Sequence, residues 1–358
     1  MSSHLMDSPL LHDHGWNAEW QETFIEHATP GAVPARVLRA ERGLCDVVTA
    51  DGQARIAVPP GGHDSAASPV TGDWITFLPG RACDDARFLT VLPRSTVLSR
   101  ASAGGSSREQ ILAVNVDTVV VAVSLAGTLR HTRTERLLSL AWASGATPVM
   151  ALTKADEHSA PESAVVEVGD LAPGVDVIAT SSRTGAGVEE LRAAIHGTVA
   201  LIGPSGAGKS SLGNRLLGSE LLATGEVRAV DGKGRHTTAW RELLPVPGGG
   251  VLLDTPGLRS VGVTRSEVAV GETFSDLEEL AEQCRFSDCA HDREPGCAVR
   301  SAISAGWITE RRLDSYRKLR READRLAART DARLRAERLA QFKSMAHQQR
   351  AASKERQA

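Results

Sequence analysis

The sequence predicts an α/β P-loop domain that binds a nucleotide, preceded by a small closed β-barrel and followed by a metal-binding, mainly helical domain. Two observations predict the central domain. Gly203–Ser210 matches the pattern Gly-x-x-x-x-Gly-Lys-Ser. An apolar run before it and a helix-forming run after it supply the strand and the helix that this loop requires. A third observation, three cysteines and a histidine close together near the C-terminus, predicts the metal site.

The phosphate loop predicts a role for each of its residues. Its glycines let the backbone curl so that consecutive N–H groups point inward, and the helix that follows adds its partial positive charge. We expect Lys209 to reach the β and γ phosphates as a catalytic residue, and the Ser210 hydroxyl to ligate Mg²⁺. The residues predicted to contact the nucleotide here are Gly203, Pro204, Ser205, Gly206, Ala207, Gly208, Lys209, Ser210 and Ser211.

A second apolar run, Val251–Leu253, ends in Asp-x-x-Gly. We expect Asp254 to hold the Mg²⁺ shell and the Gly257 amide to sense the γ phosphate as part of the catalytic machinery. Between the two motifs, a hydroxyl of Thr237 or Thr238 is predicted to complete the Mg²⁺ shell, and the sequence leaves open which of them does so. The alternative for the threonine segment is a polar surface loop.

The residue after Gly257 is Leu258, where many GTPases carry the glutamine that orients the attacking water. Leucine has no group for this task. His236 is the candidate within the chain, because a neutral imidazole can accept a hydrogen bond from water. A solvated loop histidine with no catalytic role is the alternative.

A base-reading element precedes the phosphate loop. The apolar run Thr147–Leu152 leads into Thr153, Lys154, Ala155 and Asp156. The Asp156 carboxylate can accept hydrogen bonds from N1–H and the exocyclic amine of guanine, and adenine offers neither. The Lys154 stem can lie along the base. A later strand ends in Ser181 and Ser182, which could contact the guanine carbonyl. These residues predict binding of GTP and GDP.

The metal cluster comprises Cys284, Cys289, His291 and Cys297. Three thiolates and one imidazole match the tetrahedral preference of Zn²⁺, and a closed set of four leaves no position for water, so we expect one structural zinc. Free cysteines or a disulfide are the alternatives. Cys45 and Cys83 lie outside the cluster and are expected to be ordinary buried residues.

The order of these motifs, base reader first and phosphate loop after it, is that of the circularly permuted GTPases. Together with Gly234–Thr238, the β domain ahead and Cys289–Val299 behind, it resembles the ribosome small-subunit-dependent GTPase A family from about residue 34 to about residue 319. The resemblance implies an OB-fold N-terminal domain that contacts RNA, a zinc-binding C-terminal domain, and GTP hydrolysis stimulated by the 30S subunit during its late maturation, with release of assembly factors.

Charge is distributed unevenly. The chain carries a net charge of −3, yet residues 311–358 hold 15 Lys and Arg against 6 Asp and Glu. A basic tail on an acidic body indicates a polyanionic partner, which the resemblance identifies as 16S rRNA. Tyr316–Ala340 lacks Gly and Pro and predicts a long, partly solvated helix. No apolar run reaches membrane-spanning length, and we expect a cytoplasmic monomer.

The predicted domain boundaries follow from these patterns. Short β-like runs at 35–48, 53–58, 73–78 and 87–92 predict the barrel. The domains are a low-order extension (1–30), the OB-type barrel (31–98), a linker (99–109), the permuted GTPase domain (110–262), the zinc-binding domain (263–327) and a basic helical tail (328–358).

Two other functions fit parts of the sequence. One is a zinc-stabilised RNA-binding module whose nucleotide site is mainly structural. The other is a P-loop kinase for a small molecule. The sequence around the loop shows no lid-like arginine cluster or acceptor pocket, and the Thr-Lys-Ala-Asp segment also argues against a kinase.

Overall fold

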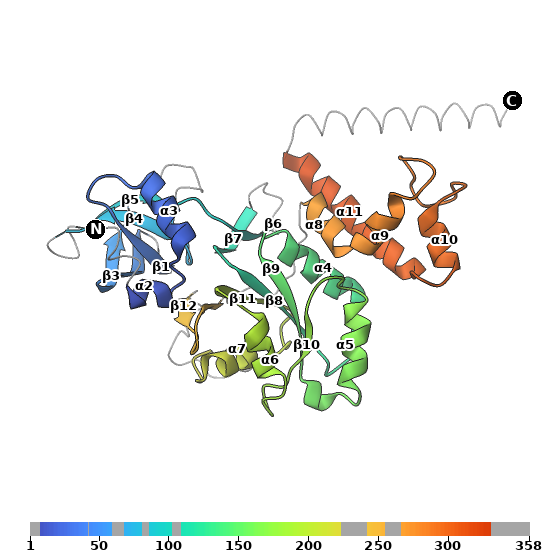
Figure 1. Cartoon of the computed structure of the whole chain (residues 1–358), viewed down its shortest axis with the longest axis horizontal. Helices are drawn as coiled ribbons and strands as arrows, with labels where there is room; N and C mark the ends of the chain where they lie inside the picture. The colour runs from blue at the N-terminus through green and yellow to red at the C-terminus, as the bar shows by residue number, and fades with distance from the viewer. Residues whose placement is uncertain are drawn as a thin grey trace, which may run out of the picture. The chain divides into compact units, whose positions relative to one another are not determined.

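The computed structural model describes residues 8–41, 43–58, 68–80, 86–101, 109–222, 242–254 and 266–330. The chain forms two compact units (Figure 1). The first unit combines Met1–Arg100 with Ile111–Val261, and the second combines Ala101–Gln110 with Gly262–Ala358. Within the described residues, none of the helices has the length and apolar character needed to cross a membrane.

A six-stranded sheet forms the centre of the first unit, and its strand order is β10-β9-β8-β11-β13-β12. All neighbouring pairs are parallel except β12 and β13, which run antiparallel. β8, the first strand of this sheet in chain order, therefore lies beside β11, the strand that leads into the phosphate loop. The strands are β8 (Thr118–Ser124), β9 (Thr147–Thr153), β10 (Val177–Ala179), β11 (Thr198–Ile202), β12 (Glu242–Pro245) and β13 (Val251–Asp254).

Helices cover both faces of this sheet because both faces are apolar. Val119 and Val121 of β8 pack in one buried cluster with residues of α4 and α5, whereas Val120 packs in a second cluster with residues of α6 and α7. Successive side chains of a strand point to opposite faces, so a continuous valine run satisfies both layers. The helices are α4 (His131–Trp142), α5 (Pro161–Gly169), α6 (Val188–Ala194) and α7 (Lys209–Leu217), with a short 3₁₀ turn, η2 (Ala155–Glu157).

The N-terminal part of the first unit is an antiparallel five-stranded sheet with the order β3-β2-β1-β4-β5. Strand β1 pairs with both β2 and β4, as the predicted OB-type barrel requires. The expected single run at 35–48 is in fact two strands, because Gly43, at a φ of +81°, permits a turn between them. The strands are β1 (Val33–Glu41), β2 (Leu44–Thr49), β3 (Gly52–Ala57), β4 (Trp74–Leu78) and β5 (Arg87–Val91).

The expected linker also contains regular structure. β6 (Val97–Ala101) and β7 (Glu109–Val114) form a two-stranded sheet at its two ends. Residues 102–108 between them lie outside the described part of the chain.

The described part of the N-terminal extension differs from the expected low order. It forms α2 (Pro9–Asp13) and α3 (Ala18–His27). Trp16, Trp20 and Phe24 recur every four residues and pack on Trp74, with the Trp16 and Trp74 ring centroids 4.8 Å apart. Such spacing places the aromatic rings on one side of the segment. The helical segment is stabilised because these rings cover a buried tryptophan of the barrel. A pattern of so few residues does not reveal this contact in the sequence.

Arg36 of β1 links three parts of the first unit. Its guanidinium, fully buried, donates to the His14 carbonyl at 3.3 Å, to the Asn115 carbonyl at 3.2 Å and to the Thr198 hydroxyl at 3.1 Å. It also lies 4.9 Å from the centroid of the Trp74 ring. Burial lowers the pKa of Arg36 to about 10, so the side chain stays charged at neutral pH. One cation therefore joins the N-terminal helices, the barrel and the first residue of β11.

The second unit is helical. Its buried core includes Phe274, Leu277, Leu313, Tyr316 and Leu319. The long helix begins before the expected Tyr316, and it buries only a narrow stripe of its surface, in agreement with its sparse apolar residues. The part of the predicted basic helix after residue 330 lies outside the described residues. The helices are α8 (Glu267–Thr273), α9 (Ser275–Ala281), α10 (Ala298–Ser304) and α11 (Glu310–Thr330).

Candidate nucleotide site and metal centre

The phosphate loop connects β11 to α7 as the sequence predicts. Gly203 has a φ of +147°, and a Cβ there would lie 2.4 Å from the Ala122 carbonyl oxygen, so this position accepts only glycine. Gly208, at a φ of +79°, is the N-cap of α7. Ser210 and Ser211 follow in the first turn of that helix. The loop therefore presents a helix N-terminus at the carboxyl edge of a parallel sheet, which is where such folds bind phosphates.

The Lys209 side chain reaches across the phosphate loop. Its ammonium donates hydrogen bonds of 2.8 Å to the carbonyl oxygens of Gly203 and of Pro204. These two contacts hold the charged group across the loop. A cation in this position can neutralise phosphate oxygens that lie on the loop amides.

The predicted base-reading segment contacts the phosphate loop directly. Thr153, at the end of β9, is buried, and its hydroxyl donates a 2.7 Å hydrogen bond to the carbonyl of Ala207. Only β8 separates β9 from β11 in the sheet, so the ends of both strands reach the same edge. Lys154 then takes a left-handed conformation with a φ of +58°, which turns the chain into the 3₁₀ turn that carries Asp156.

Two groups flank the Asp156 carboxylate. A hydrogen bond from the buried Ser181 hydroxyl, aided by the Arg183 guanidinium, lowers the pKa of Asp156 below its ordinary value. Arg183 forms an ion pair with Oδ2 of Asp156. The Ser181 hydroxyl accepts a hydrogen bond from the Thr184 N–H at 3.1 Å, which orients its proton toward the carboxylate. The lowered pKa keeps Asp156 ionised, which its predicted role of accepting hydrogen bonds from guanine requires.

The helix of the phosphate loop also holds the segment that follows β10. Arg215 of α7 donates to the carbonyl of Ser182 at 2.6 Å and to the carbonyl of Arg183 at 3.1 Å. Ala155 donates its N–H to the Thr180 carbonyl at 3.0 Å. The three loops that the sequence predicts to meet at the nucleotide are therefore cross-linked by hydrogen bonds.

An open pocket of about 300 Å³ adjoins these loops. The phosphate loop forms one wall through Pro204–Ala207, and Lys154 forms another. The end of β8, the loop after it and the first turns of α4 complete the lining, including Arg130 and Arg133. The edge of the sheet is therefore hollowed beside the phosphate loop, and cations line the hollow.

Five residues with predicted roles lie outside the described part of the chain: His236, Thr237, Thr238, Gly257 and Leu258. Asp254 ends β13, and the pairing of Ala200 with Leu253 brings that strand end to the same edge as the phosphate loop. The roles predicted for these residues remain predictions.

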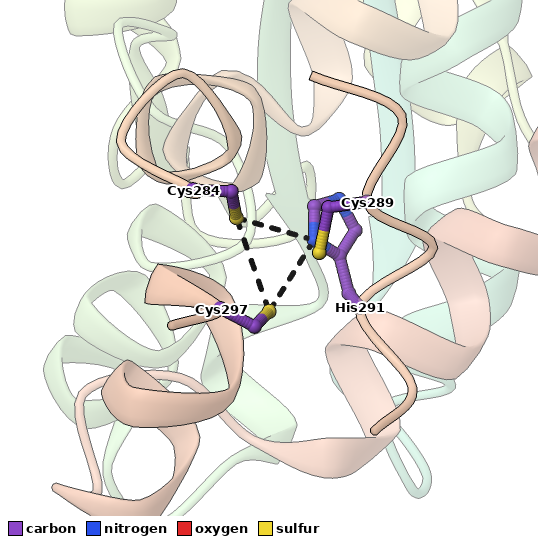
Figure 2. Close-up of side chains that lie close together, drawn as sticks. All are labelled: Cys284, Cys289, His291 and Cys297. Atoms are coloured by element: carbon purple, nitrogen blue, oxygen red, sulfur yellow. Dashed lines mark hydrogen bonds between the residues drawn. The ribbon is translucent and has the colours of Figure 1, made fainter. Parts of the chain in front are cut away.

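The predicted metal ligands of the second unit converge (Figure 2). One ligand atom from each of Cys284, Cys289, His291 and Cys297 lies within 4.8 Å of all the others. The Sγ atoms of Cys284 and Cys297 are 3.9 Å apart, and each is 3.6 Å from Nδ1 of His291. Zinc–sulfur bonds of about 2.3 Å and zinc–nitrogen bonds of about 2.0 Å place tetrahedral ligands at about these separations. The cluster is compatible with a zinc site, and its cysteines are free thiols.

Neighbouring residues hold the metal-binding loop in shape. Burial, reinforced by the charge of Arg317, lowers the pKa of His291, which keeps the ring neutral and able to ligate a metal. Arg317 of α11 also donates to the His291 carbonyl at 2.8 Å. The Glu294 carboxylate accepts from the N–H groups of Ala290, Asp292 and Arg293 at 2.8–3.0 Å. Cys45, outside the cluster, is buried in β2, as expected.

Sequence reasoning missed Arg183 and Arg215, which organise the predicted base site. A signal was available for Arg183, because it directly follows the Ser181-Ser182 pair. Arg215 offers no such signal, since its role depends on which loop lies beside α7.

Known proteins resemble this chain over most of its length. A family model described as RsgA GTPase matches residues 91–264. The small ribosomal subunit biogenesis GTPase RsgA of Streptomyces coelicolor is 50% identical over 344 residues, covering 94% of this chain and 92% of the relative. A protein of the same name from Xanthomonas axonopodis is 39% identical over 351 residues, covering 92% of this chain and 94% of the relative.

Solved structures show the same fold. YjeQ from Thermotoga maritima matches with a TM-score of 0.60 at 26% identity, over 82% of this chain and 98% of that chain. YloQ, described as a circularly permuted GTPase, matches with a TM-score of 0.60 over 83% of this chain and 96% of that chain. At 22% identity, the second likeness supports the fold alone.

Proposed function

The chain belongs to the RsgA GTPase family, and from this premise we propose that it hydrolyses GTP in the assembly of the small ribosomal subunit. One observation carries the proposal. The Thr153 hydroxyl donates to the Ala207 carbonyl, so the segment that we propose reads guanine lies against the phosphate loop although the two are far apart in the chain. A GTPase needs both parts on a single nucleotide.

In the proposed site the loop amides and Lys209 bind the phosphates of GTP, and Ser210 offers its hydroxyl to Mg²⁺. The metal, when bound, neutralises charge that develops on the phosphate oxygens. Asp254 and a hydroxyl of Thr237 or Thr238 are the further candidate ligands. Ser205, Gly206 and Ser211 complete the phosphate contacts.

The base is read at the opposite end. Asp156 accepts hydrogen bonds from N1–H and the exocyclic amine of guanine. The N–H of Ser181 is already donated to the Ala186 carbonyl at 2.9 Å, so we assign the contact with the guanine carbonyl to the N–H of Ser182. The aliphatic stem of Lys154 lies along the base.

Hydrolysis requires an oriented water. Leu258 offers no polar group, and we propose that His236 orients the water once the small subunit is bound. This makes intrinsic turnover slow and turnover on the subunit fast. The amide of Gly257 senses the γ phosphate in the same step.

The second unit supplies a basic surface for rRNA. Lys318, Arg321 and Arg325 of α11 are exposed and follow each other at spacings that place them on one side of the helix. Three cations in such a row suit consecutive phosphates of 16S rRNA. We propose that one zinc ion holds the fold of this unit, and that the protein acts in the cytoplasm as a monomer.

Nucleotide state is proposed to govern release. β13, which carries Asp254, is the last strand of the GTPase sheet, and the chain continues from it into the second unit. A γ-phosphate-dependent change at Gly257 is therefore close in sequence to the zinc domain. Affinity for the small subunit should be higher with a non-hydrolysable GTP analogue than with GDP, and equal affinities would remove this part of the proposal.

The test of the function is GTP turnover with isolated 30S subunits, with 50S subunits and with neither. We expect a large increase with 30S alone. A rate of GTP turnover that does not change when subunits are added would favour the alternative, a zinc-stabilised RNA-binding module with a mainly structural nucleotide site. Transfer of the γ phosphate to an acceptor other than water would indicate a kinase.

A further inference from the structure

We propose that Arg183 competes with guanine for the Asp156 carboxylate and thereby limits how tightly the site holds its nucleotide. The inference rests on the proposed function, because it takes Asp156 as the group that reads the base. It adds a determinant of nucleotide affinity that the motifs themselves do not contain.

The burial of the two partners shows from which side Arg183 approaches. The Asp156 side chain is 13% exposed, whereas that of Arg183 is 73% exposed. On its protein side the carboxylate has the fully buried Ser181. The guanidinium therefore pairs with Asp156 from the solvent side, which is the side left for a base to enter.

Arg183 and guanine present the same chemistry to a carboxylate. The guanine edge offers N1–H and an exocyclic amine in parallel, and a guanidinium offers parallel N–H donors from a planar group. The Arg183 guanidinium occupies Oδ2 of Asp156, one of the two oxygens that a guanine edge needs. The base can reach that oxygen only when the ion pair opens, so the two donors compete.

The exchange requires little movement of the backbone. The carbonyls of Ser182 and Arg183 are anchored by Arg215, at 2.6 and 3.1 Å. The loop can thus stay in place for its guanine contact while the exposed Arg183 side chain rotates away. Rotation of an exposed side chain is fast compared with nucleotide exchange, so the competition acts on the equilibrium affinity.

The experiment measures the Kd for GDP by calorimetry on the full chain. Arg183→Gln should tighten binding about two- to fivefold, the range of a partly exposed ion pair. Arg183→Lys keeps the charge but lacks the planar guanidinium, so its Kd for GDP should lie between those of the unmodified chain and Arg183→Gln. The difference from the unmodified chain should shrink as salt rises, because screening weakens the pair. Arg55→Gln, which removes the arginine of another partly exposed Arg–Asp ion pair, with Asp46 of the barrel sheet, is the matched control and should leave the Kd unchanged.

A double-mutant cycle separates this inference from the function on which it rests. In the Asp156→Asn background, Arg183→Gln should no longer tighten binding, since the ionised partner is gone. Unchanged or weaker GDP binding by Arg183→Gln alone would overturn the inference. If Asp156→Asn binds GDP as tightly as the unmodified chain and has no altered base preference, the proposed base reader fails instead.

Discussion

The hydroxyl of Thr153 donates a 2.7 Å hydrogen bond to the carbonyl oxygen of Ala207, across 54 positions of the chain. Thr153 begins the segment proposed to read guanine, and Ala207 lies in the phosphate loop. Neither group reaches solvent, since both residues are buried. This contact fixes the position of the proposed base-reading segment relative to the phosphate loop.

Removing that hydroxyl should weaken nucleotide binding. Thr153→Val keeps the shape and leaves a buried carbonyl without this donor, at a cost of about 1–3 kcal/mol. We expect the Kd for GDP to rise about tenfold. Thr153→Ser retains the donor and should stay within a factor of about two of the unmodified chain. Equal Kd values for the valine and serine variants would show that the bond does not organise the site.

Guanine selectivity should withstand acid. The Ser181 hydroxyl and the Arg183 guanidinium hold the pKa of Asp156 below 3.8, its ordinary value. Because this pKa is lowered, the ionised carboxylate is fully present at pH values above its ordinary pKa. The interaction that depends on it is lost only as the pH falls through the pKa in the folded protein. The ratio of GDP to ADP affinity should therefore stay constant from neutral pH to about pH 5. Ser181→Ala should move the loss of selectivity to higher pH, and a decline near neutrality in the unmodified chain would contradict the assignment.

Loss of zinc should unfold the second unit selectively. Cys297 is both a predicted ligand and the N-cap of α10, accepting from the Arg300 N–H at 3.4 Å. Cys297→Ala should abolish metal retention and reduce the helical signal measured by circular dichroism. Cys45→Ala, in the barrel, serves as the control and should retain one zinc per chain. A cysteine variant that loses zinc yet keeps its helical content would disprove the structural role.

Arg36 should contribute strongly to the stability of the first unit. Arg36→Met leaves the carbonyls of His14 and Asn115 without this donor, and we expect the free energy of unfolding to fall by about 2–4 kcal/mol. Arg55→Met is a matched control in the same sheet. Its ion pair with Asp46 is half exposed and should contribute less than about 1 kcal/mol. Urea denaturation measures the free energy of unfolding of both variants. Similar decreases for the two would mean that the buried hydrogen bonds of Arg36 stabilise the protein no more than the exposed ion pair of Arg55 does.

Lys209 should be indispensable for turnover. Its ammonium already lies across the phosphate loop, bonded to Gly203 and Pro204. Lys209→Ala removes the only phosphate-directed cation that the motif supplies, so GTP hydrolysis stimulated by 30S subunits should fall to background. Arg55→Ala, on the barrel, should leave intrinsic hydrolysis unchanged. Persistent stimulation in Lys209→Ala would place the catalytic nucleotide elsewhere.

Much of the site follows from local sequence. Gly203 and Gly208 adopt backbone conformations that only glycine adopts freely, and Lys209 follows at a fixed spacing. The phosphate loop can therefore be recognised from the sequence. The metal ligands are similarly compact in sequence. Val119 and Val121 pack on one face of the sheet and Val120 on the other, an alternation that follows from strand geometry alone.

Other features were not predictable in this way. The N-terminal helices are ordered by contact with Trp74, more than fifty positions later in the chain. The partner of Arg36 at Thr198 is 162 positions away, and no periodic pattern links the two. Arg183 and Arg215 show the same limitation, because their partners depend on which loops share an edge of the sheet.

The chemical groups could be identified from the chain alone: the phosphate loop, the carboxylate predicted to bind guanine and the four predicted metal ligands each lie within a short stretch. How these parts meet depends on the fold, through the strand order that sets Thr153 against Ala207 and through the arginines that anchor the loops. The difference lies in the range of the interactions. Backbone conformation and ligand spacing depend on neighbouring residues, whereas the hydrogen bonds of buried Thr153 and Arg36 depend on surfaces that exist only after the chain has folded.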